Sequence, residues 1–277
     1  MIPFGYPPPR NPSPKCSYAI RWHWDDRQES TAAIADKIVR TLTALSNACP
    51  LLTGWGIADP DWKIVDPDEM DEDELENMED SVPLPFEDVA GRMEEIVEGH
   101  VDRDDWGKAC PRAGYHILVF KNAPPGHPRD QGIVLKFGVG SVGSNTIHFD
   151  VGGVAEPSSL EISTLALFKP VFDIVTAIWS PLWASASVFR MYYYEPNAVA
   201  GVSDFPYSAV HMPWMVYLSA PLMEGIIIPS GLQPELTPDG GLQFTSTQEQ
   251  LNPDNPAHMQ VAKTLAELVI PRLPANS

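Results

Sequence analysis

The chain lacks the cysteine patterns that support a disulfide framework or a metal centre. Its three cysteines, Cys16, Cys49 and Cys110, are odd in number and far apart, and they form no Cys-x-x-Cys pair. We therefore expect ordinary thiols in a reducing compartment rather than disulfide bonds.

Long apolar runs and an export signal are also missing. The first fifteen residues, MIPFGYPPPRNPSPK, contain six prolines and lack the apolar core of a signal peptide. No apolar run reaches the roughly 18 residues of a membrane span. These features predict a cytoplasmic protein without a membrane partner, and an extended proline-rich arm over residues 1–15.

Basic residues are absent from the most acidic part of the chain. Residues 66–80, DPDEMDEDELENMED, contain ten carboxylates in fifteen positions. Between residues 66 and 105, 18 acidic residues face two basic ones, a charge of −16, and the other residues hold 19 acids and 16 bases, a charge of −3. Such a field repels nucleic acid and anionic membranes and attracts basic proteins. We therefore expect no nucleic-acid partner.

Two motifs suggest ligand binding, but the residues around or within them do not fit a phosphate-binding loop or a calcium loop. Gly138, Gly140 and Gly143 spell GxGxxG, but a strand pattern follows them where the phosphate-binding motif needs a helix, so they predict a hairpin turn. The acidic stretch does not fit a calcium loop, because Asp71 and Asn77 occupy the positions of its glycine and its bidentate acid.

No set of residues suggests catalysis. His23 with Asp25, and His148 with Asp150, are two positions apart on predicted strands, but two ligands make a poor metal site. No GxSxG motif or Cys/His cluster adds to them. We expect no catalytic residue, no metal and no cofactor, and therefore no enzyme. Four tryptophans could stack on a ligand, but such residues usually build core: Trp22, Trp55, Trp106 and Trp179.

Hydrophobic patterning predicts an α+β fold. Strands are expected at 18–24, 115–120, 132–139, 145–152, 186–194, 214–222 and 240–247. Helices are expected from Ser30 or Thr31 to 48, from Pro85 to Gly99, over 169–179, and from Asn255 onward. Their apolar stripes are Ile34, Ile38, Leu42 and Leu45; Phe86, Val89, Met93 and Ile96; Phe172, Val175 and Trp179; and Val261, Leu265, Leu268 and Val269. Pro170 lies either in a first turn or inside a longer, kinked helix.

The strands arrive in consecutive runs joined by short turns. This order predicts a largely antiparallel sheet with helices packed on it. We expect a single domain over residues 16–277, with the acidic stretch at about 66–80 as an insertion.

Short motifs follow one another in order from about residue 16 to 270. The opening, RWHWDDRQES and then AAIADKIVRTLTALSNACPLLTGW, is followed by GHVDRDDWGKACPRAGYHILVFKNA, IVTAIWSPLWASASV and GGLQFTSTQEQLNPDNPAHMQVAKTLAEL. This series resembles the immunity-protein-52 family of bacterial polymorphic toxin systems. The positions that match are Arg21, Trp22, Arg27, Glu29, Ser30, Trp55, Gly114, Trp179 and Pro181. The proline-rich arm and the acidic stretch depart from the family's shared pattern.

The resemblance implies a cytoplasmic antidote to a toxin, commonly a restriction-endonuclease-like DNase, with a type VI secretion system as one route of delivery. A nuclease cleft is basic, so an acidic protein can be steered to it and occlude it, or block the toxin's assembly. An acidic chaperone or adaptor for another basic protein is the alternative, and a solvated loop with no partner is the alternative for residues 66–80. The oligomeric state is not predicted. The expected toxin-binding residues are Asp71, Glu72, Asp73, Glu74, Glu76, Glu79 and Asp80.

Overall fold

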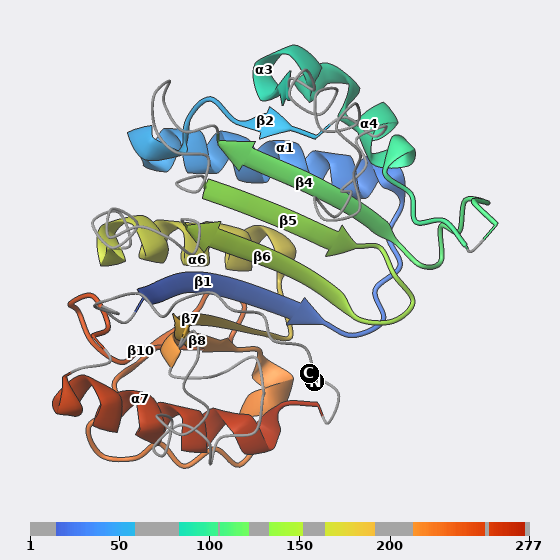
Figure 1. Cartoon of the computed structure of the whole chain (residues 1–277). Coiled ribbons are helices and arrows are strands. Elements are labelled where there is room, and N and C mark those ends of the chain that lie inside the picture. Colours follow the sequence, from blue (N-terminus) through green and yellow to red (C-terminus); the bar gives the residue numbers. More distant parts are fainter. Residues whose placement is uncertain are drawn as a thin grey trace, which may run out of the picture.

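One antiparallel sheet organises the chain. The computed structural model describes residues 15–58, 83–104, 106–121, 133–151, 164–191, 213–252 and 255–274. They form a ten-stranded sheet in the order β3-β2-β4-β5-β6-β1-β7-β8-β10-β9, and its strand pairs are antiparallel. Helices pack on this sheet (Figure 1), which confirms the expected α+β fold. The proposed acidic insertion, and the proline-rich arm before Lys15, lie outside the described residues.

The first of the described strands, β1, lies in the middle of the sheet. β1 pairs with β6 on one side and with β7 on the other, so it joins the two halves. The long strands are β1 (Lys15–Trp24), β4 (Tyr115–Lys121), β5 (Ile133–Val139), β6 (Asn145–Val151), β7 (Trp183–Met191) and β8 (Pro213–Leu218). The short ones are β2 (Gly56–Ile57), β3 (Leu84–Pro85), β9 (Pro234–Leu236) and β10 (Leu242–Thr245).

The helix ends follow local capping chemistry. α1 (Thr31–Ala48) begins after Ser30, whose hydroxyl accepts the Ala33 backbone N–H at 3.2 Å. It ends before Cys49, and Pro50 then opens the short 3-10 helix η1 (Pro50–Leu52). α7 (Pro256–Val269) starts behind Asn255, whose side chain accepts the Ala257 N–H. These boundaries were predicted.

The expected helix from Pro85 to Gly99 is broken into three parts. Pro85 belongs to β3 and caps α3 (Phe86–Val89), and η2 (Ala90–Arg92) and α4 (Met93–Gly99) follow. Gly91 explains the interruption, because glycine has the lowest helix propensity of all residues except proline. The predicted stripe is nevertheless buried, and the helix ends at Gly99 as expected.

The third helix is longer than the predicted 169–179. α6 (Leu165–Trp179) begins after Thr164, whose hydroxyl accepts the Leu167 N–H. Pro170 is therefore inside the helix rather than in its first turn. A proline there removes one backbone donor, so the packing of this apolar helix on the sheet must compensate.

Two predicted strands are too long. β8 ends at Leu218 rather than 222, because Ala220–Met223 forms the 3-10 helix η4 with Pro221 in its first turn. β10 covers only part of 240–247. β2, β3 and β9 were not predicted, since strands of two or three residues are too short to show an alternating pattern.

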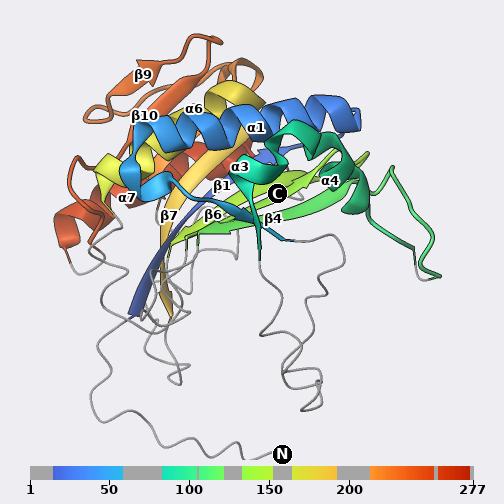
Figure 2. The same ribbon diagram turned by 90° about the horizontal axis from the view of Figure 1, so that it is seen from above.

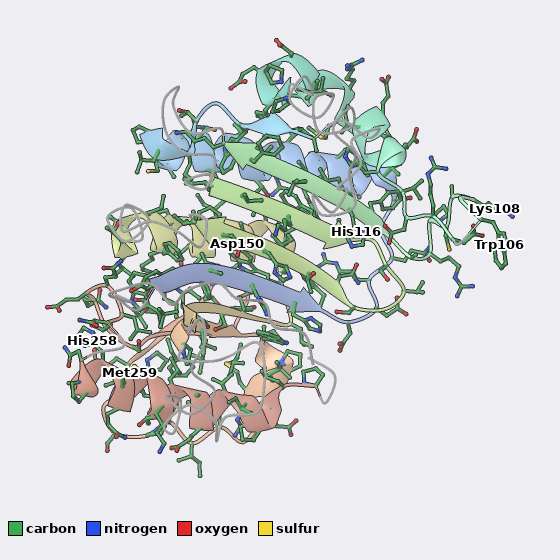
Figure 3. The ribbon with its side chains drawn as sticks, viewed as in Figure 1. Trp106, Lys108, His116, Asp150, His258 and Met259 are labelled. Carbon is green, nitrogen blue, oxygen red and sulfur yellow. The ribbon has the colours of Figure 1, made fainter. Side chains whose placement is uncertain are left out.

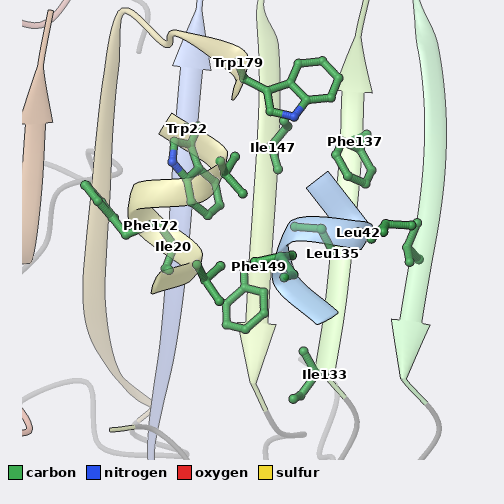
Figure 4. Close-up of a cluster of buried hydrophobic side chains, with 14 of the residues drawn as sticks. Ile20, Trp22, Leu42, Ile133, Leu135, Phe137, Ile147, Phe149, Phe172 and Trp179 are labelled. Carbon is green, nitrogen blue, oxygen red and sulfur yellow. The ribbon is translucent and has the colours of Figure 1, made fainter. Parts of the chain in front are cut away.

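The larger core lies between the sheet and helices α1 and α6 (Figures 2 and 4). Two of its tryptophans bind hydroxyls on the helices. Trp22 Nε1 donates to Thr176 Oγ1 at 3.0 Å, and Trp179 Nε1 donates to Thr41 Oγ1 at 2.9 Å. Both bonds satisfy buried indole N–H groups; the first fixes α6 against β1, and the second joins α6 to α1.

A smaller core joins α7 to the other end of the sheet. It contains Trp183, Val216, Leu218, Phe244, Leu265 and Val269. The predicted α7 stripe is correct at Leu265 and Val269, but Ala262 and Ala266 are buried while Val261 and Leu268 are only partly so. Among the described helices, none combines the length and the apolar character that a membrane crossing needs.

Candidate protein-binding surface

An acidic ridge follows the predicted toxin-binding segment along the chain. The seven predicted carboxylates between Asp71 and Asp80 lie outside the described residues, so their positions are not part of the structure. The ridge consists of exposed side chains on α3 and α4, namely Glu87, Asp88, Glu94, Glu95 and Glu98. Arg92 is the one basic residue within these described helical turns.

Helical periodicity produces the ridge. Phe86, Val89 and Met93 face the core, and the intervening positions therefore point to solvent. The ridge is held in place by α1, where Thr31 Oγ1 donates to Glu94 Oε1 at 3.1 Å. Figure 1 shows α3 and α4 at the β2–β4 end of the sheet, beside α1.

A projecting hairpin follows α4 directly. Isolated bridges pair Val101 with Tyr115 and Arg103 with Ala109. At its tip the Asp104 carboxylate accepts the backbone N–H of Trp106 at 3.1 Å and of Lys108 at 2.9 Å. Figure 3 shows Trp106 and Lys108 at the end of the hairpin, which projects to one side of the sheet beyond β4.

Trp106 differs from the other three tryptophans that the sequence singled out. Trp22, Trp55 and Trp179 are at most 2% exposed, which confirms their expected place in the core. Trp106 is 88% exposed, so the expectation that it builds core is wrong. A signal existed in the sequence, since DRDDWGK surrounds the tryptophan with turn residues and not with an alternating apolar pattern.

Three of the residues on which the predicted resemblance rests, Arg27, Glu29 and Trp179, join elements of the fold. Arg27 donates to the Trp179 backbone carbonyl at the end of α6, and its Nε lies 2.8 Å from Glu29 Oε1. Glu29 also pairs with Lys37, whose ammonium lies 5.2 Å from the Trp179 ring centroid. This group ties the loop after β1 to both large helices.

The outer face of the sheet, which points away from α1 and α6, carries the histidines considered as ligands. Register places His148 beside Arg21 on β1 and Lys136 on β5. His23 Nε2 lies 3.7 Å from Asp25 Oδ1, and Lys136 Nζ lies 3.7 Å from Asp150 Oδ2. Within the described residues, no three His, Cys, Asp or Glu side chains gather as a metal site.

Burial lowers the pKa of both histidines. For His148, Arg21 and Lys136 lower the pKa further, and Asp150 opposes them only in part. For His23, burial again lowers the pKa, and the nearby Asp25 raises it by less. Both imidazoles are therefore predominantly neutral at pH 7, and the positive charge beside His148 comes from Arg21 and Lys136.

The glycine motif forms the predicted turn. β5 ends at Val139 and β6 begins at Asn145, and the two strands are antiparallel. Gly140 has φ +80°, and a Cβ there would meet Ile34 at 2.9 Å, so the turn needs glycine at this position. The structure thus confirms a hairpin in place of a phosphate-binding loop.

Comparisons with known proteins do not assign a family. No protein-family model matches the chain, and no curated protein matches it. Among solved structures, Pseudomonas aeruginosa T6SS protein PA0821 is similar with a TM-score of 0.48 and 8% sequence identity. The match covers 92% of this chain and 76% of that one. Similarity at this level does not indicate a function.

Proposed function

We propose that this chain is an immunity protein that binds and neutralises a secreted nuclease toxin. The observation that carries the proposal is the acidic ridge on α3 and α4, which continues a sequence segment with ten further carboxylates. The ordered motifs that resemble the immunity-protein-52 family support the same reading. Neutralisation would follow from occlusion of the toxin's basic cleft or from a block of its assembly.

The ridge suits a basic partner for an electrostatic reason. A nuclease cleft concentrates Lys and Arg to hold phosphates, so its field is complementary to a row of carboxylates. Complementary fields raise the association rate more than they raise the final affinity, because exposed charges are solvated and screened. The ridge and residues 71–80 would therefore speed the encounter, while other contacts hold the complex.

In this proposal the chain acts by binding and catalyses no reaction. Silencing a lethal enzyme calls for nanomolar affinity or better, which corresponds to about 12 kcal/mol. An interface of about 1,600 Å² with apolar anchors is the usual way to reach it. The partner is thus a protein, and neither nucleic acid nor membrane is expected to bind.

Co-expression tests the proposal. The resemblance implies that the antidote and its toxin are encoded side by side, so the product of the adjacent gene is expressed in cells with or without the chain, and survival is counted. We expect survival only with the chain, and nanomolar binding to a catalytically inactive toxin in calorimetry. Absence of binding by that toxin would contradict the proposal, and binding to a basic protein without protection would favour the chaperone alternative.

Charge variants test the role assigned to the carboxylates. Replacing Asp71, Glu72, Asp73, Glu74, Glu76, Glu79 and Asp80 with Asn or Gln should slow association about tenfold or more at low salt, with less change in dissociation. In a second variant, Glu87, Glu95 and Glu98 become Gln. Its matched control changes three exposed glutamates near the α7 end of the sheet, Glu224, Glu249 and Glu267. If the ridge variant and its control slowed association equally, the association rate would depend only on net charge and not on the position of the carboxylates.

A further inference from the structure

The hairpin between α4 and β4 presents one large apolar side chain to solvent. Trp106 is 88% exposed, whereas the fully buried large side chains include Trp22, Trp55, Trp179, Trp183 and Trp214. An indole is the largest apolar side chain, and leaving it in water forgoes the burial that stabilises the others. The fold therefore gains little from a tryptophan at this position.

The hairpin nevertheless holds the backbone at Trp106 in a defined conformation. Asp104 accepts two backbone N–H groups across the turn, and the Gly107 N–H donates to the Asp104 carbonyl at 2.8 Å. Gly107 has φ +76°, a conformation that glycine adopts without strain. Arg103 Nη1 donates to the Gly107 carbonyl at 3.0 Å. A contact residue held in this way loses little conformational entropy on binding.

The base of the hairpin is tied to the sheet as well. The Asp102 N–H donates to the Gly114 carbonyl at 3.0 Å, and the Cys110 N–H donates to the Asp102 carbonyl at 2.7 Å. The Asp102 carboxylate lies 2.6 Å from His116 Nδ1 on β4. The tip is thus a rigid projection on the β4 side of the sheet, next to the acidic ridge.

Charge summed over the whole hairpin sequence is balanced, unlike charge on the ridge. Asp102, Asp104 and Asp105 stand against Arg103, Lys108 and Arg112 in the sequence of the hairpin. The hairpin therefore has no strong net field of its own, and the feature that distinguishes it is the exposed indole. A contact made there depends on apolar burial and on an acceptor for the indole N–H.

We propose that Trp106 is the anchor residue of the complex, and that its indole enters an apolar pocket on the toxin. This inference rests on the proposed function and names the residue that provides affinity. The ridge and the tip then have separate tasks, since surface charge governs the association rate and a buried aromatic anchor governs the dissociation rate. The occupant of the pocket is this one side chain, not a general apolar patch.

The test uses the full chain and the inactive toxin domain encoded beside it. Trp106→Ala is compared with Ile227→Ala in surface plasmon resonance. Ile227 is 84% exposed and follows Ile226, which packs on the small core at the α7 end of the sheet, so the control removes an equally exposed apolar side chain far from the hairpin. Thermal unfolding should be nearly unchanged in both variants, because neither side chain is buried.

We expect Trp106→Ala to weaken binding by thirtyfold or more, about 2 kcal/mol, mainly through faster dissociation, and Ile227→Ala to change it less than threefold. Wild-type binding with less than threefold loss in Trp106→Ala would overturn the anchor and leave the proposed function standing. Equal losses in the two variants would also overturn it. No binding by the wild type would overturn the proposed function itself, and the anchor with it.

Discussion

The two faces of β6 differ in how deeply they bury their side chains. Ile147 and Phe149 are completely buried beneath α1 and α6, whereas His148 and Asp150, one position along, are only partly buried on the outer face. Figure 4 shows the inner residues among the rings of the large core. Because side chains alternate along a strand, every second residue of β6 packs in the core, and the residues between them stay partly exposed on the outer face.

The largest expected effect comes from the inner face. Phe149→Ala should lower the free energy of unfolding by about 3–5 kcal/mol, because it removes a buried ring and leaves a cavity. Phe149 packs edge-on against Phe168 of α6, with ring centroids 5.7 Å apart. Denaturant unfolding followed by circular dichroism measures the loss.

The matched control for Phe149→Ala lies on the outer face of the same strand. Thr146 is partly buried, and Thr146→Ala should cost about 1 kcal/mol or less. Similar losses in the two variants would break the contrast between the faces.

A smaller loss of stability should follow from removing the Thr176 hydroxyl, which lies on α6 in the large core. Thr176→Val leaves the buried Trp22 Nε1 without its acceptor, which should cost about 1–3 kcal/mol. Thr264→Val is the control, since Thr264 also lies on a helix, but its hydroxyl donates only to the Gln260 backbone carbonyl at an exposed site. A loss of less than about 0.5 kcal/mol in Thr176→Val would show that the indole finds another partner.

The inner face was largely predictable because its signal repeats. Ile34, Ile38, Leu42 and Leu45 recur at helical spacing, and each is fully buried. Strand alternation likewise located β4, β5 and β6, and turn glycines located the β5–β6 hairpin. Repetition lets several residues report the same periodicity, so one misleading position does little harm.

Features set by single residues or by distant pairing were not predictable. The break at η2 depends on one glycine, and β9 exists because Pro234–Leu236 finds a partner in β10. The exposure of Trp106 depends on the hairpin projecting past the sheet. The predicted toxin-binding carboxylates stay a prediction, since they lie outside the described residues.

The histidines of the outer face should make the stability of the fold depend on pH. The pKa of His148 is lowered below its ordinary 6.5, first by burial and then by Arg21 and Lys136. The unfolded state therefore binds the proton more readily, and stability should fall as the pH drops through 6.5 towards the lower folded pKa. His148→Gln should reduce this fall between pH 7 and pH 5, measured by urea unfolding.

His23 provides a second variant for the same measurement. Burial also lowers its pKa, against the opposing effect of Asp25, so His23→Gln should likewise flatten the pH dependence. The slope is the readout, because His23 stacks on Trp183 and its loss will lower stability at every pH. An unchanged slope in both variants would mean that protonation of this face is not linked to folding.

The smallest expected effect concerns the ion pair on the outer face. Lys136 Nζ and Asp150 Oδ2 are 3.7 Å apart, and their side chains are 58% and 40% exposed. Water screens a pair with this exposure, and ordering two side chains costs entropy, so a double-mutant cycle with Lys136→Met and Asp150→Asn should give a coupling of about 0–0.5 kcal/mol. Raising the salt concentration should reduce even that coupling, because screening acts on exposed charges. A coupling above about 1 kcal/mol that survives high salt would mean that the pair is shielded from water, and that the outer face of β5 and β6 is part of the structural core in the same way as their inner face.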